Sequence, residues 1–286
     1  MPIPTILLTI IIFFSTFSCS HFSSTNNSND SGNTNNASKK KKFDEIKTEK
    51  VVFDYSDSTG DYRLVREVGK VGKVAKDRNN YFVKTQILPE NGDEKNVLEN
   101  IFAISNLEEL HVKGSDGKSG VVKTLTPKIS QYTVWLEGQK YFSQLKVDYK
   151  KRMLEVLSID EEKKVKDKTK VKIPKKNSIT CFFSQVDECI RVTGFLTLAK
   201  EKKAGSVPIQ LIWDGHPFFQ EQYNYLPKNI FSNATFEYDG ELEDGTIRFA
   251  LNVEGQSILY HFSTSNDLIK KLWVNQGITQ ERSTIK

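Results

Sequence analysis

The chain has 286 residues, 37% of them hydrophobic, enough for the core of one large β domain or of two smaller domains. Its 41 basic residues outnumber its 36 acidic residues and give a formal net charge of +5. Acidic and basic residues are interleaved, and no basic stretch carries the aromatic residues that would stack on nucleotide bases. We therefore expect no nucleic-acid partner.

The first eighteen residues are typical of a secretory signal peptide. They contain no charged side chain, and residues 6–14 are almost purely apolar. The apolar stretch is shorter than the roughly 20 residues that a membrane-spanning helix needs, and Pro4, Thr9 and Ser15 interrupt it. We predict a signal peptide at residues 1–18, with an uncleaved membrane anchor as the alternative.

Residues 16–19, Thr-Phe-Ser-Cys, resemble the lipobox of bacterial lipoprotein precursors, in which a small residue precedes the lipid-carrying cysteine. The resemblance implies lipid attachment at Cys19, through a diacylglyceryl group and a further acyl chain such as palmitate. Ser20 follows the cysteine where an aspartate would favour retention in the inner membrane, so we expect the periplasmic face of the outer membrane. The alternative is an ordinary signal peptide cut near Ser18 or Ser20.

Residues 19–49 are predicted to be the lipidated cysteine and a disordered tether. Residues 20–42 are rich in Ser, Asn and Thr and end in four lysines, and Phe22 is their only large apolar side chain. Such a tract cannot bury enough apolar area to offset the entropy lost on ordering. The remainder, residues 50–286, is predicted to be a mainly β envelope domain.

Alternating apolar and polar residues predict antiparallel strands in this domain. Residues 247–253 and 256–262 form a predicted hairpin, and residues 235–242 reach it through the turn at Asp244 and Gly245. A second hairpin joins residues 130–136 to 139–149 at Glu137 and Gly138. Further strands are predicted at residues 50–55, 61–68, 80–88, 101–105, 153–159 and 207–213. The lysine-rich residues 160–176 are either a connector or a long hairpin.

One helix is predicted after Ser184, where Ser184 and Asp187 have the spacing of a capping box and apolar residues recur near helical period up to Ala199. Cys181 and Cys189 are a predicted disulfide, with two buried free thiols as the alternative. Eight positions along a helix span about 12 Å, too far for a disulfide, so the pair requires Cys181 to precede the helix.

No catalytic, metal or cofactor site can be read from the sequence. The four histidines, His21, His111, His216 and His261, are scattered without metal-ligand spacing. Residues 117–119 and residues 213–217 are both predicted turns, the second of them a hairpin turn. Paired carboxylates, with Asp214, Glu221 and Asp239 as candidates, would be needed for an envelope hydrolase or glycan-processing enzyme.

Aromatic residues are the remaining candidates for ligand binding. Eight of them could line an apolar cavity in a curved sheet: Trp135, Tyr141, Phe142, Trp213, Phe218, Phe219, Tyr223 and Tyr225. We predict ligand contacts for Trp135, Tyr141, Trp213, Phe218 and Phe219. The alternative for each of them is packing in the core.

The order of features from Ser130 onward resembles the uncharacterised periplasmic family known as domain of unknown function 3108. The resemblance is carried by residues 132–138, Tyr-Thr-Val-Trp-Leu-Glu-Gly, by Ile173-Pro174, by the helix from Asp187, by residues 212–215, Ile-Trp-Asp-Gly, and by the terminal meander. It implies a curved antiparallel sheet or half-barrel with one covering helix, located in the cell envelope, and it supplies no activity and no catalytic residues.

From these features we predict an outer-membrane lipoprotein without catalytic activity that binds an envelope lipid, glycan or protein partner. An envelope hydrolase that uses paired carboxylates is one alternative. A structural scaffold of an envelope complex is another.

Overall fold

The computed structural model describes residues 48–71, 79–113, 119–160, 162, 164–174, 179–223 and 225–284. The chain divides into two units, Met1–Lys42 and Phe43–Lys286. The first unit lies outside the described residues, and with it the predicted signal peptide, Cys19 and most of the predicted tether. Of the predicted turn at residues 117–119, only the backbone of Ser119 is described, and the side chain of His111 is not described either. The following paragraphs concern the second unit.

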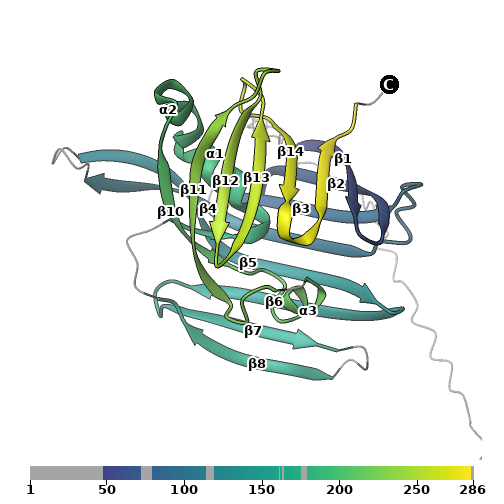
Figure 1. Ribbon diagram of the computed structural model, residues 1–286. Coiled ribbons are helices and arrows are strands. Elements are labelled where there is room, and N and C mark those ends of the chain that lie inside the picture. The colour runs from purple at the N-terminus through teal and green to yellow at the C-terminus, as the bar shows by residue number, and fades with distance from the viewer. Residues whose placement is uncertain are drawn as a thin grey trace, which may run out of the picture. The chain divides into compact units, whose positions relative to one another are not determined.

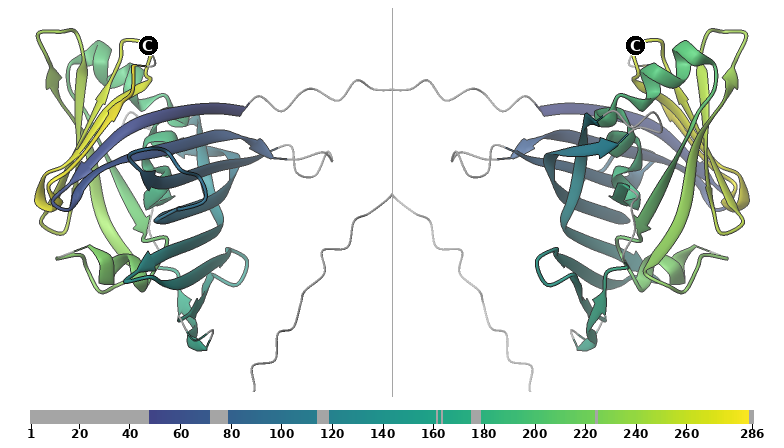
Figure 2. Two further views of the ribbon diagram at one scale, coloured as in Figure 1. Left: turned by 90° about the vertical axis from the view of Figure 1, so that its right-hand side faces the viewer. Right: turned by 90° about the vertical axis from the view of Figure 1, so that its left-hand side faces the viewer.

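The described residues form one open, curved sheet of fifteen strands (Figures 1 and 2). The strands are β1 Thr48–Asp57, β2 Gly60–Val71, β3 Asn80–Pro89, β4 Glu99–Lys113, β5 Ser119–Leu136, β6 Gln139–Asp148, β7 Met153–Ile159, β8 Val165–Lys172, β9 Ile179–Phe182, β10 Ser206–Ile212, β11 Phe231–Glu241, β12 Ile247–Val253, β13 Gln256–Phe262, β14 Leu268–Trp273 and β15 Ile278–Arg282. All neighbours are antiparallel except β9 and β10. The predicted mainly β, curved antiparallel fold is confirmed.

The sheet consists of two runs of sequential strands that meet at a seam between β1 and β15. The spatial order is β8-β7-β6-β5-β4-β3-β2-β1-β15-β14-β13-β12-β11-β10-β9. At the seam, four residue pairs are aligned, from Phe53 opposite Arg282 to Ser56 opposite Thr279. The first and last strands along the chain are therefore neighbours in the sheet, and both contribute to the same inner face.

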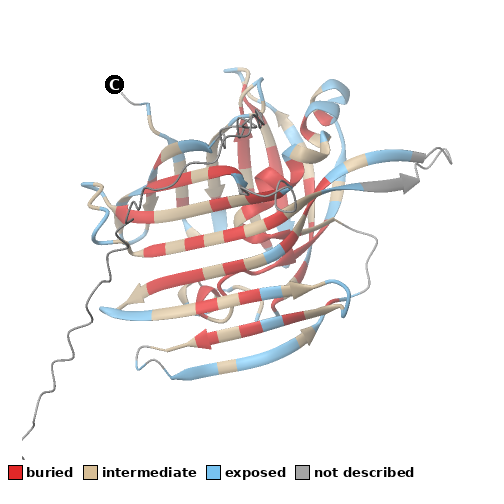
Figure 3. Ribbon diagram, turned by 180° about the vertical axis from the view of Figure 1, so that it is seen from behind, coloured by how far each residue is buried: buried red, intermediate tan, exposed pale blue. Residues whose placement is uncertain are grey.

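A helical segment lies against this inner face. The 3-10 helix η2 (Phe183–Gln185) contacts β3 and β4, and helix α1 (Val186–Thr193) contacts β5. Val186, Cys189 and Ile190 are fully buried, because positions i, i+3 and i+4 share one face of a helix. The strands around the segment show the alternating burial of a sheet with one packed face (Figure 3). The sheet and the helical segment share one apolar core.

The predicted helix is present but differs from its prediction in two ways. Gly194, in a left-handed conformation with φ of 78°, ends α1 and separates it from α2 (Phe195–Lys202). The predicted capping box is wrong, because no side chain caps α1. Ser184 instead donates its hydroxyl hydrogen to Asp214, and Asp187 accepts hydrogen bonds from Arg66. Buried partners outside the helix thus satisfy both side chains.

Most predicted hairpins are confirmed, with their turns. Glu137 and Gly138 have φ of 52° and 78° between β5 and β6, and Gly245 has φ of 80° between β11 and β12. The lysine-rich segment pairs with β7 as strand β8, so it is a hairpin rather than a connector. Strands β4 and β5 are much longer than predicted, with 15 and 18 residues.

The predicted hairpin turn at residues 213–217 is wrong. These residues lead into a short helix, α3 (Phe218–Gln222), and a loop precedes β11. Phe218 and Phe219 are almost completely buried, and Phe219 packs against Tyr132 with ring centroids 5.8 Å apart. The connection therefore adds apolar groups to the core, which a tight turn could not do.

Cys181 and Cys189 lie at disulfide distance. Cys181 belongs to β9 and Cys189 to α1, and their Cα atoms are 6.3 Å apart. The disulfide requires Cys181 to precede the helix. This condition is met, because β9 ends at Phe182 and η2 turns the chain before α1 begins. The pair connects the edge strand β9 to the helix that fills the inner face.

Candidate ligand-binding cavity

Strand pairing across the seam places five polar or amphipathic side chains in one row. Residues directly opposite each other in antiparallel strands project from the same face of the sheet. The row runs through β13, β14, β15, β1 and β2 and consists of Tyr260, Lys271, Gln280, Tyr55 and Tyr62. Its first four members line a cavity on the inner face, between the sheet and η2.

The cavity has a volume of about 70 Å³. A buried water molecule needs roughly 10–15 Å³ of such space, so the cavity holds about five. Seven of its nineteen lining residues are aromatic, and they come from the sheet, from η2 and from α3 and the residue after it: Phe53, Tyr55, Phe183, Phe219, Tyr223, Tyr260 and Trp273. It is smaller than the roughly 300–1,000 Å³ of a pocket for a drug-sized ligand, so it fits a small or slender molecule.

Lys271 brings a cation into this aromatic cavity. Its Nζ atom lies 4.9 Å from the ring centroid of Phe183 and 5.5 Å from that of Tyr260, within the range of a cation–π interaction. It makes no ion pair or hydrogen bond with any described residue. Burial lowers the pKa of Lys271 to about 8, although nearby Asp187 acts in the opposite direction. Lys271 is half-buried, so its ammonium group is partly desolvated without a paired carboxylate.

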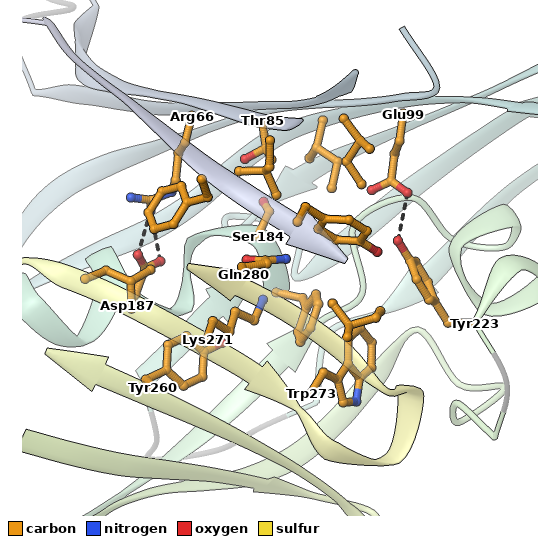
Figure 4. A pocket seen from close by; sticks show the side chains of 18 of the residues that line it. Arg66, Thr85, Glu99, Ser184, Asp187, Tyr223, Tyr260, Lys271, Trp273 and Gln280 are labelled. Atoms are coloured by element: carbon orange, nitrogen blue, oxygen red, sulfur yellow. Dashed lines mark hydrogen bonds and ion pairs between the residues drawn. The ribbon is translucent and has the colours of Figure 1, made fainter. Parts of the chain in front are cut away.

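Besides Ser184, which is bonded to Asp214, two uncharged polar side chains line the cavity. Gln280 lies directly opposite Lys271 on β15, and Thr85 projects from β3. Within the described residues, neither side chain makes a hydrogen bond. Figure 4 shows Lys271 and Gln280 in the middle of the cavity, between the Arg66–Asp187 pair on one side and the Glu99–Tyr223 pair on the other.

The cavity's second cation, Arg66, is fully engaged by helix α1. Its Nη2 atom lies 2.8 Å from Asp187 Oδ2, and its Nη1 atom lies 3.3 Å from Glu188 Oε1. Glu188 also accepts a hydrogen bond from the Tyr81 hydroxyl, over 2.7 Å. Burial favours a raised pKa for Glu188, but Arg66 and Arg191 lower it below its ordinary value. Arg66 is therefore a structural cation, whereas Lys271 is unpaired.

Glu99 lies at the opposite end of the cavity among hydroxyl donors. Its Oε2 atom accepts hydrogen bonds from Tyr223, over 2.9 Å, and from Tyr132, over 3.3 Å. Burial raises the pKa of Glu99 to about 7, and these hydrogen bonds only partly oppose the rise. At neutral pH this carboxyl group is therefore protonated in a large fraction of molecules.

The three carboxylates of the hydrolase alternative do not line the cavity. Asp214 is completely buried and accepts hydrogen bonds from the Ser184 amide and hydroxyl, and burial raises its pKa to about 6. Glu221 forms an ion pair with Lys166 over 2.8 Å, and Asp239 forms one with Arg248 over 2.5 Å. Each carboxylate thus has its own local partner.

Of the five aromatic residues predicted to contact a ligand, Phe219 lines the cavity and the other four do not. Trp213 is completely buried and donates its Nε1 hydrogen to Ser232 over 2.8 Å. Phe218 is buried against Tyr141, with ring centroids 5.1 Å apart. Trp135 is half-buried and packs beneath the ammonium group of Lys140. Tyr223, also named from the sequence as a possible cavity residue, does line it.

Among the described residues, no group of three or more His, Cys, Asp or Glu side chains is arranged to hold a metal ion. Nor does that part of the chain contain a helix of sufficient length and apolarity to cross a membrane.

Comparison of the chain with models of protein families, with curated proteins and with solved structures finds no match. The resemblance to the domain of unknown function 3108 family therefore stays a prediction. The cavity itself is the observation from which a function can be argued.

Proposed function

We propose that this protein is a bacterial outer-membrane lipoprotein, anchored through Cys19, whose sheet domain binds an amphiphilic component of the envelope without catalysing a reaction. The observation that carries the binding role is the aromatic cavity on the inner face of the sheet, with the unpaired Lys271 in its wall. Apolar walls that surround a few polar groups are the usual composition of a small-molecule site.

The anchor is supported by the sequence and by the cysteine pair. An apolar leader followed by Cys19 and a polar tract is the arrangement that a tethered lipoprotein requires. Cys181 and Cys189 at disulfide distance fit an oxidising compartment such as the periplasm.

Among the predicted ligands, an amphiphile fits the cavity better than a glycan or a protein surface. A standard protein interface buries about 800 Å² on each partner. The exposed large apolar side chains of the described residues are spread over separate elements, for example Val121 on β5, Leu198 on α2 and Val274 on η3 (Val274–Gln276). These exposed side chains belong to different elements, whereas the cavity gathers aromatic groups in one place.

The anchor is tested by the intact mass of protein purified from bacterial membranes, measured with and without reduction. We expect a chain that begins at Cys19 and carries diacylglyceryl and acyl groups, and that is two hydrogens lighter before reduction. An unmodified mass with another first residue would remove the lipoprotein proposal and make Cys19 incidental.

Binding is tested by saturation-transfer NMR with hexanol on the full-length protein in lipid nanodiscs, with empty nanodiscs as the blank. We expect transfer to the alkyl protons of hexanol. Leu64→Trp, which adds bulk to the cavity wall, is expected to abolish it, whereas Val274→Trp at an exposed site keeps it. Absence of transfer with the unmodified protein, together with co-purification of a protein partner, would favour the scaffold alternative.

A further inference from the structure

The polar groups of the cavity indicate which class of amphiphile it takes. Among the described residues, two cations and two carboxyl groups line the cavity: Arg66, Lys271, Glu99 and Asp187. Arg66 and Asp187 neutralise each other, and Glu99 is held by tyrosine hydroxyl groups. Lys271 remains as a cation without a counter-charge in direct contact.

We propose that the ligand is a monocarboxylate with a short apolar body, and that its carboxylate pairs with Lys271 and accepts a hydrogen bond from the Gln280 amide. This proposal rests on the binding role proposed above for the same cavity. It adds the charge and the head-group chemistry of the ligand.

Desolvation is the first argument for an anionic ligand. A charged group that loses water without gaining a partner is costly, and an oppositely charged partner in hydrogen-bonding contact offsets the cost. The rings of Phe183 and Tyr260 compensate Lys271 only in part, because a cation–π contact contributes less than a charge-assisted hydrogen bond. A ligand carboxylate beside the ammonium group supplies the charge-assisted hydrogen bond that these rings cannot make.

Charge balance is the argument for a single negative charge. A phosphate monoester carries nearly two charges at neutral pH, and only one unpaired cation faces the cavity. Its second charge would be buried near the carboxyl groups of Asp187 and Glu99. A monocarboxylate is neutralised by Lys271 alone.

Strand register supplies the second donor. Gln280 lies directly opposite Lys271, so the two side chains leave neighbouring strands on the same face. The Gln280 amide has no other partner among the described residues, and Figure 4 shows both side chains directed into the same space. A carboxylate has two oxygen atoms, and the pair offers one donor for each.

The walls and the size of the cavity describe the rest of the ligand. Aromatic rings around a space for about five water molecules suit a slender alkyl or aryl group. Hexanoate is a suitable probe, because hexanol and hexylammonium have the same apolar body with a neutral and a cationic head group.

The experiment is isothermal titration calorimetry of these three probes and of hexyl phosphate, with the full-length protein in nanodiscs and with empty nanodiscs subtracted. We expect hexanoate to bind at least about tenfold more tightly than hexanol, as a hydrogen-bonded charge pair implies, and hexylammonium to bind most weakly. Lys271→Met should reduce the affinity for hexanoate to that for hexanol.

Lys270→Met is the matched control. Lys270 precedes Lys271 on β14 but does not line the cavity, and its ammonium group pairs with Glu281 over 2.7 Å. The preference for hexanoate should persist in this variant. Gln280→Leu should weaken hexanoate binding without weakening hexanol binding.

Each contrary result overturns a defined part of the proposal. Equal affinities for hexanoate and hexanol, or a preference that survives Lys271→Met, would overturn the role of Lys271 and leave amphiphile binding in place. Tighter binding of hexyl phosphate that depends on Lys271 would overturn the monocarboxylate assignment. No binding of any probe would overturn this inference and the proposed function together.

Discussion

At the scale of single residues, Glu99 shows how the fold changes the chemistry of a side chain. The carboxyl group leaves water on folding, and the hydrogen bonds from Tyr132 and Tyr223 do not fully replace hydration, so its pKa rises to about 7. The folded protein therefore binds a proton at Glu99 over a pH range in which the unfolded chain does not. Thermodynamic linkage turns this difference into a pH-dependent stability.

Glu99→Gln should remove part of the pH dependence of the folding stability. The pKa of Glu99 is raised in the folded state. The contribution of Glu99 to the free energy of unfolding is therefore fully present below its ordinary pKa of 4.5 and is lost as the pH rises to about 7. At about 1.4 kcal/mol per pKa unit, a rise from 4.5 to about 7 makes the loss at most about 3–4 kcal/mol. Urea unfolding at pH 5 and pH 8 should therefore show a smaller decrease in unfolding free energy for Glu99→Gln than for the unmodified protein.

The control for this prediction is Glu109→Gln, because Glu109 is exposed on β4. This variant should show the same decrease between pH 5 and pH 8 as the unmodified protein. If Glu99→Gln changed the unfolding free energy equally at both pH values, the proton on Glu99 would not be the cause.

At the scale of secondary structure elements, buried charges connect helix α1 to strand β2. Arg66 comes from β2, and Asp187 and Glu188 come from the first turn of α1. Glu188 has a second cation in Arg191, whereas Asp187 has Arg66 as its ion-pair partner. Loss of one member of a buried pair leaves the other charge uncompensated, which costs about 3–5 kcal/mol.

Arg66→Met should therefore lower the free energy of urea unfolding by about 3–5 kcal/mol. The double variant Arg66→Met/Asp187→Asn removes the orphaned charge as well, so it should recover a large part of the loss. Arg63→Met, on the same strand but exposed, should have little effect. Equal stability of the single and double variants would show that the pair does not connect α1 to the sheet.

The sequence predicts the elements more completely than the site. Local turn residues and alternation identify the hairpins, because both signals lie within a few residues of each strand. Strand β14 was not predicted, and a register shift opposite His261 and Phe262 changes its alternation. Leu268 and Lys271 therefore line the same cavity although they are three residues apart.

Local sequence signals also do not predict the long-range contacts of the site. Lys271 occurs at an even spacing from Trp273, an alternation that could have indicated an inward lysine once β14 was recognised. No local signal places Gln280 beside Lys271, or Glu99 beside Tyr223, which is 124 positions away. The cavity depends on strand pairing between distant segments, and a single sequence does not reveal that pairing.

At the scale of the whole sheet, the seam between β1 and β15 holds together the two runs of strands. Phe53 and Tyr55 on β1 and Ile278 and Gln280 on β15 all line the cavity. The site therefore exists only when β1 and β15 are paired. The seam contains four aligned residue pairs, as many as β14 and β15 share, whereas β1 and β2 share ten.

A disulfide across the seam tests this arrangement. Asp54 lies opposite Glu281, one position out of phase with the cavity residues Tyr55 and Gln280, so the pair projects from the outer face. Opposite residues in antiparallel strands have Cα atoms about 4.5–5.5 Å apart, a separation that a disulfide spans. The variant Asp54→Cys/Glu281→Cys should therefore oxidise to a cross-linked form without altering the cavity.

Cross-linking should raise the free energy of unfolding by about 2–4 kcal/mol, because it closes a long loop in the unfolded chain. Reductant also acts on Cys181 and Cys189, so its effect on the variant must be compared with its effect on the unmodified protein. The oxidised variant should still bind hexanol, since the new bond lies on the face opposite the cavity. If the two cysteines failed to pair, β1 and β15 would not be neighbours, and the cavity that depends on them would be lost as a site.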